Sequence, residues 1–97
     1  MAQVAYLAQS LDEIERAFQS IRATDRPATS RAAAAIHSAI AGLEAHPLVG
    51  RRLEGELREL VISYGQTGFV ALYRFEILHD QVYVLAIRRQ REFGFVP

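Results

Sequence analysis

Runs of apolar and β-branched residues dominate the C-terminal half of the chain. Leu60–Ile62 and Phe69–Phe75 are rich in Val, Ile, Tyr and Phe, and Val82–Ile87 is β-branched at three of its six positions. Glycines punctuate the first gap between these runs, and His79-Asp80 punctuates the second, as is typical of hairpin turns. The pattern therefore predicts three consecutive antiparallel strands.

The N-terminal half instead has helical spacing after a weakly alternating segment, Gln3–Ala8, which we expect to form an edge strand. Ser10 and Glu13 have the spacing of a capping box, which predicts a helix start. Apolar residues then follow at intervals of three and four, the spacing of a buried helical stripe: Leu11, Ile14, Ala17, Phe18 and Ile21.

A second helix is predicted from Ala28 to about Ala45, because Asp25 can cap it and Pro27 suits a first helical turn. Its apolar stripe consists of Ala33, Ile36, Ile40 and Leu43. The segment Leu48–Arg52 is expected to be a loop that leads into the sheet. Residues 1–97 are thus expected to form a single α+β domain, a helical hairpin on one face of a small antiparallel sheet, in the order β-α-α-β-β-β.

Strand pairing predicts which side chains share a face. A four-residue first turn, Gly65–Gly68, sets Glu59 opposite Arg74, and a short second turn sets Val70 opposite Arg89. One face is then almost entirely apolar and needs a cover, with residues Leu60, Ile62, Tyr64, Phe69, Ala71, Tyr73, Phe75, Val82, Val84 and Ala86. The other face mixes charge with exposed aliphatics, and includes Glu59, Val61, Val70, Leu72, Arg74, Tyr83, Leu85, Ile87 and Arg89. Both faces depend on register, because a slip of one residue exchanges them.

Composition narrows the candidate chemistry. The formal net charge is zero, so bulk electrostatics give no reason to expect nucleic-acid binding. There is no cysteine, and the three histidines are scattered, so we expect neither a metal site nor a cofactor. No apolar run approaches the ~20 residues that span a bilayer, and a soluble cytoplasmic protein is the expectation.

Several segments together resemble toxins of the RelE/ParE superfamily of type II toxin–antitoxin systems. They are LEAHPLVGRRLEG at 43–55, Arg58-Glu59-Leu60, Tyr73-Arg74 and AIRRQRE at 86–92. The resemblance covers nearly the whole chain, including the helix pair and the order of elements. It implies a toxin blocked by a cognate antitoxin, usually encoded beside it. RelE-like members cut messenger RNA on the ribosome without a metal, and ParE-like members poison DNA gyrase.

RNA cleavage would need a base, cations for the developing phosphorane charge and an acid for the leaving oxygen. Under this alternative Glu59 would be the base, and Arg74 and Arg89 the cations. RNA-cleaving relatives commonly place a tyrosine or histidine near the C-terminus as the acid, but the matching region here, 88–95, has neither. The missing acid favours gyrase inhibition. A carboxylate opposite an arginine, as predicted for Glu59 and Arg74, is more often an ordinary cross-strand ion pair than a catalytic pair.

Two sets of residues are candidates for binding a partner. Arg88, Arg89 and Arg91 could contact gyrase, nucleic acid or an acidic antitoxin segment, or simply form a solvated strand end. Val70, Leu72, Leu85 and Ile87 would form an exposed aliphatic patch for an antitoxin segment or a homodimer. We therefore expect a ParE-like gyrase inhibitor, with a RelE-like endoribonuclease and a degenerate non-toxic binding module as alternatives.

Overall fold

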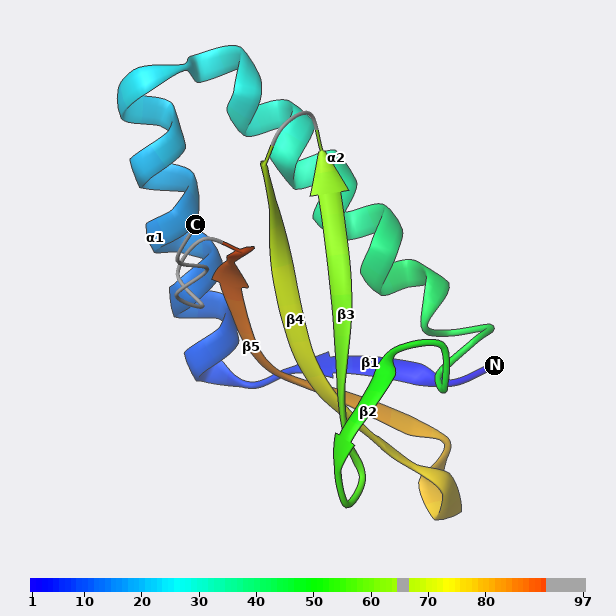
Figure 1. The fold of residues 1–97 in the computed structure, drawn as a ribbon. Helices are drawn as coiled ribbons and strands as arrows, with labels where there is room; N and C mark the ends of the chain where they lie inside the picture. Colours follow the sequence, from blue (N-terminus) through cyan, green and yellow to red (C-terminus); the bar gives the residue numbers. More distant parts are fainter. Residues whose placement is uncertain (65–66, 91–97) are drawn as a thin grey trace.

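Two helices cover one face of a five-stranded sheet in the computed structural model, which describes residues 1–64 and 67–90 (Figure 1). The elements are β1 (Gln3–Tyr6), α1 (Ala8–Thr24), α2 (Arg26–Gly42), β2 (Arg51–Glu54), β3 (Leu57–Tyr64), β4 (Thr67–Glu76), the 3₁₀ turn η1 (Ile77–His79) and β5 (Gln81–Arg89). The strand order is β1-β5-β4-β3-β2.

The α+β class, the helical hairpin and the edge position of β1 are confirmed. Two features differ from expectation. β1 pairs with β5 in parallel, so the sheet is mixed rather than purely antiparallel. Residues expected to be a loop also contribute to β2, which pairs with β3 and carries only exposed side chains. An exposed strand has no apolar alternation, so the hydrophobic pattern did not reveal it.

The predicted capping box at Ser10 is wrong, because α1 begins earlier, at Ala8. Ser10 lies within the first turn, where it is buried and its hydroxyl donates to the carbonyl of Leu7 at 2.7 Å. Ile21 is buried as predicted, whereas Leu11 is 52% exposed and does not belong to the core.

The start of α2 agrees with the prediction. Asp25 caps the helix by accepting a hydrogen bond from the backbone N–H of Ala28 at 3.2 Å, and Pro27 lies in the first turn. The helices join at Asp25 and diverge from there, so that α1 contacts β5 and α2 contacts β3 (Figure 1). Among the described residues, neither helix is long and apolar enough to cross a membrane.

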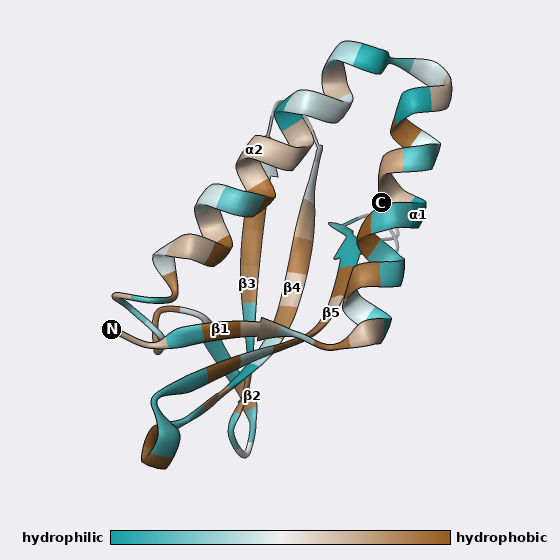
Figure 2. Cartoon of the chain, turned by 180° about the vertical axis from the view of Figure 1, so that it is seen from behind, coloured by the Kyte–Doolittle hydropathy of each residue, from teal (hydrophilic) through white to brown (hydrophobic). Residues whose placement is uncertain are grey.

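The core lies between the helices and the sheet face predicted to need a cover. Hydrophobic stretches run along the middle of β3, β4 and β5 (Figure 2). The buried residues of this face include Ile62, Phe69, Ala71, Tyr73, Val82 and Val84. They pack against Ile36 and Ile40 of α2 and against Leu43, which follows the end of that helix. Alternation therefore identified the correct faces of β3 and β4.

The β3–β4 register differs from the prediction by two residues. Tyr64 pairs with Thr67 rather than Phe69, and Glu59 consequently lies opposite Leu72 rather than Arg74. A shift of two residues keeps every side chain on its predicted face, because side chains recur on one face at every second residue. The predicted pair is thus wrong, although both members lie on the same face.

A register shift in the β4–β5 pairing has a larger effect. Arg74 lies opposite Tyr83 and Tyr73 opposite Val84, but Leu72 lies opposite Ala86, which leaves Leu85 as an extra residue. Beyond such a bulge, each side chain of the strand lies on the face opposite to the one that regular alternation predicts. Ile87 and Arg89 therefore lie on the helix-covered face, opposite Ala71 and Phe69, and their predicted place on the open face is wrong.

Candidate functional site

The sheet face away from the helices carries an ion pair between β2 and β3. Arg51 lies opposite Glu59, and its Nε and Nη2 donate to Oε1 of Glu59 at 2.9 and 2.6 Å. The Glu59 side chain is 20% exposed and that of Arg51 72%. Glu59, the predicted base of the RNase alternative, is thus held by an arginine that sequence reasoning had not paired with it.

Arg74 lies on the same face but at another position along β4. The carbon of its guanidinium is 5.4 Å from the centroid of the Tyr83 ring, which is a cation–π geometry. In the part of the chain that the structure describes, Arg74 has no ion-pair partner. Its exposed charge remains available to an anion on the open face.

Arg89 lies on the other side of the sheet, where it lines a cleft between α1 and β5. The cleft has a volume of about 210 Å³, and the described residues that line it are Glu13, Arg16, Ala17, Ser20, Ile87, Arg88 and Arg89. The Nε of Arg89 is buried and has no hydrogen-bond partner. The structure therefore does not bring Glu59, Arg74 and Arg89 together on one face.

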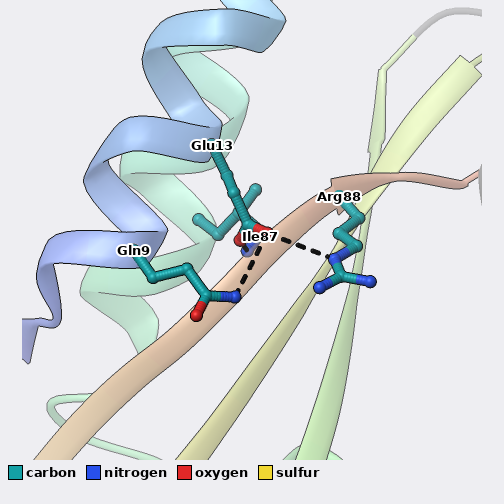
Figure 3. Close-up of polar contacts among 4 residues, drawn as sticks. All are labelled: Gln9, Glu13, Ile87 and Arg88. Carbon is teal, nitrogen blue, oxygen red and sulfur yellow. Dashed lines mark hydrogen bonds and ion pairs between the residues drawn. The ribbon is translucent and has the colours of Figure 1, made fainter.

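Glu13 joins α1 to the edge of β5 (Figure 3). Its Oε1 accepts a hydrogen bond from the backbone N–H of Ile87 at 2.9 Å, and its Oε2 lies 3.3 Å from Nε of Arg88. Gln9 donates to the same carboxylate at 3.4 Å. The pairing of β1 with β5 ends at Val84. Beyond that residue, Glu13 provides the acceptor for the N–H of Ile87 that a neighbouring strand would otherwise provide.

The segment before β2 is attached to the sheet through Tyr73. The Tyr73 hydroxyl accepts a hydrogen bond from the N–H of Gly50 and donates one to the carbonyl of Pro47, both at 2.8 Å. Burial raises the pKa of Tyr73 above its ordinary value, although the Gly50 N–H and the charge of Arg58 act in the opposite direction. Arg58 donates to the carbonyls of Leu48 and Gly50, so this part of the chain has a defined conformation.

The predicted aliphatic patch is largely unavailable on the open face. Val70 is 5% exposed and Ile87 2% exposed, so the prediction that they are exposed is wrong. Leu72 and Leu85 are half-buried.

Arg91, the third arginine of the predicted basic cluster, lies outside the described residues. Within the described ranges, no group of three or more His, Asp or Glu side chains could hold a metal ion.

Comparison with known proteins identifies the family. The model of the ParE toxin of the type II toxin–antitoxin system parDE matches residues 4–93. The chain belongs to the ParE toxin family. A search of curated proteins found no relative that matches this ParE-family chain.

Two solved structures share the fold of this ParE-family chain. A chain from the chromosomal ParDE system of P. aeruginosa has a TM-score of 0.75 at 18% identity, covering 92% of this chain and 96% of that one. A chain from the RelBE2 toxin–antitoxin complex of Mycobacterium tuberculosis has a TM-score of 0.60 at 22% identity, covering 92% and 98%. At these identities the likeness concerns the fold.

Sequence reasoning missed the roles of Glu13 and Arg16 in this ParE-family chain. Polar residues outside the apolar stripe of a helix usually face water, so the pattern of α1 gave no reason to place either residue in a site. Their spacing, one helical turn apart, places them on one face. A strand end rich in arginine was the available signal that an acidic residue would pack against it.

Proposed function

We propose that the chain is a toxin that inhibits DNA gyrase and that a cognate antitoxin neutralises it. Membership of the ParE toxin family supports this proposal, and both structural neighbours come from toxin–antitoxin systems. Gyrase and the alternative target, the translating ribosome, are both cytoplasmic, and this is the compartment in which we propose that the chain acts.

The position of Arg89 is the observation that carries this choice of target. A metal-independent ribonuclease needs its base and its phosphate-binding cations around one phosphate. Arg89 lies on the helix-covered face, whereas Glu59 and Arg74 lie on the open face, and Glu59 is already paired with Arg51. This arrangement favours inhibition by binding over catalysis of RNA cleavage.

One observation favours RNA cleavage as the second candidate. Glu59, Arg51 and Arg74 share the open face, so a carboxylate and two cations are present on one surface. Arg51 could replace Arg89 as a phosphate-binding cation, because its guanidinium offers the same planar fork. The missing general acid still counts against this candidate.

A supercoiling assay tests the first proposal. Purified gyrase is incubated with plasmid DNA and the purified chain, with and without ATP, and scored for lost supercoiling and trapped cleaved DNA. Trapped cleavage supports gyrase as the target. No effect at high molar excess contradicts it, and messenger RNA on translating ribosomes becomes the substrate to examine by primer extension.

Growth of cells that express variants separates the candidates further. Glu59→Gln and Arg74→Gln should leave growth arrest intact if gyrase is bound elsewhere, and should abolish it if these residues cleave RNA. Folding and antitoxin binding of both variants serve as the control. A soluble wild-type chain that causes no arrest contradicts both toxin activities and favours a degenerate binding module.

A further inference from the structure

The cleft between α1 and β5 is lined by more arginines than acidic residues. Arg16, Arg88 and Arg89 line it together with a single acidic residue, Glu13. Glu13 is committed to Arg88 and to the N–H of Ile87. Among the described residues, Arg16 and Arg89 have no ion-pair partner, so the cleft has two uncompensated cations.

The Nε of Arg89 adds a second observation. This donor is buried but has no acceptor, an arrangement that costs free energy in a folded protein. Like charges that line one small cavity also repel one another. Both costs disappear if an anion enters the cleft and accepts hydrogen bonds from the unpaired guanidinium groups.

We propose that the cleft binds a carboxylate side chain of the antitoxin, an inference that rests on the proposed antitoxin partner. A carboxylate matches the planar fork of arginine and is small enough to enter a cavity of about 210 Å³. The Glu13 carboxylate disfavours a dianionic phosphate in the same space. The zero net charge of the chain likewise gives a polynucleotide no long-range attraction.

The test is the affinity of purified variants for the full-length antitoxin encoded beside the toxin gene, measured by isothermal titration calorimetry. Arg16→Gln and Arg89→Gln should each weaken binding by more than about tenfold, because an antitoxin carboxylate loses a cationic partner that lines the cleft. Arg89→Lys should lie between Arg89→Gln and wild type, since it keeps the charge and loses the fork. Arg22→Gln is the matched control, an exposed arginine near the end of α1 that does not line the cleft.

Thermal unfolding of the free chain distinguishes a role of Arg89 in antitoxin binding from a role in stabilising the fold. Arg89→Gln should not lower the thermal midpoint of the free chain, because the substitution removes an unpaired charge. Wild-type affinity in Arg16→Gln and Arg89→Gln, or tighter competition by inorganic phosphate than by acetate at equal ionic strength, overturns the proposal. If the wild-type chain does not bind the antitoxin at all, this inference fails, while the gyrase assay still decides the target separately.

Discussion

The hydroxyl of Tyr73 accepts a hydrogen bond from the backbone N–H of Gly50 at 2.8 Å and thereby attaches the segment before β2 to the centre of β4. The same hydroxyl donates to the carbonyl of Pro47. Tyr73 and Gly50 are both buried, so the Gly50 N–H has no water as an alternative partner there. One phenol thus satisfies two backbone groups.

Replacing Tyr73 with phenylalanine should therefore cost more stability than the loss of one surface hydrogen bond. The ring still fills its place in the core, but the Gly50 N–H and the Pro47 carbonyl lose their partner. We expect the free energy of unfolding to fall by about 1–3 kcal/mol in urea denaturation. Tyr83→Phe is the matched control, because no hydrogen bond of the Tyr83 hydroxyl is found in the described residues. Equal stability of the two variants would contradict this role of Tyr73.

Gly50 should not tolerate a side chain. A Cβ at this position would lie 2.6 Å from Cε1 and from the hydroxyl oxygen of Tyr73, and 2.7 Å from the carbonyl oxygen of Glu59. Gly50→Ala should destabilise the fold by about 1–3 kcal/mol, as overpacking does. Gly42→Ala meets no atom within 4 Å and lies at the end of α2, so it should be neutral or stabilising. Thermal unfolding of both variants checks this contrast, and similar midpoints would refute it.

The alternation of apolar and polar residues along the sequence predicted those features of the fold that depend on which side chains are buried. Tyr73 and Phe69 are buried as predicted, because in a strand without a bulge the face on which a residue lies depends on whether its position is odd or even. The β3–β4 register did not affect this result, since it differs from expectation by an even number of residues. The partner of Glu59 does depend on register, and it was predicted wrongly.

The bulge at Leu85 could not be read from the sequence. No glycine or proline marks it, and the residues around it are apolar on both sides, so either alternation fits the pattern. This single extra residue moves Arg89 from the predicted open face to the cleft beside α1. The candidate site was therefore less predictable than the fold, because it depends on one local irregularity.

Glu13 should stabilise the outer edge of β5. Glu13→Ala leaves the N–H of Ile87 without its acceptor and Arg88 without its ion pair. Because the lost hydrogen bond involves a charged group, we expect a loss of about 1.5–3 kcal/mol. The amide of Ile87 should also exchange with solvent at least about tenfold faster in hydrogen-exchange measurements.

Glu15→Ala is the control for this prediction, because Glu15 lies on the same helix and, among the described residues, its carboxylate accepts a hydrogen bond only from exposed Gln19. Glu13→Gln separates the two contacts of Glu13. Its amide oxygen can still accept from Ile87, so amide protection should largely remain while the attraction to Arg88 is lost. Unchanged exchange at Ile87 in Glu13→Ala would show that the strand edge does not need this carboxylate.

Stability should fall at alkaline pH because of two tyrosines. Burial raises the pKa values of Tyr73 and Tyr6 above their unfolded value of 10.0, so the folded state holds their protons more tightly than the unfolded state. Their contribution is therefore fully present below pH 10 and is lost as the pH rises from there through the folded pKa values. With neither lysine nor cysteine in the chain, few other groups titrate in this range. Urea denaturation between pH 8 and 11 should show this decline in the wild type and a shallower one in Tyr6→Phe and Tyr73→Phe. The same slope in all three proteins would exclude these phenols as the cause.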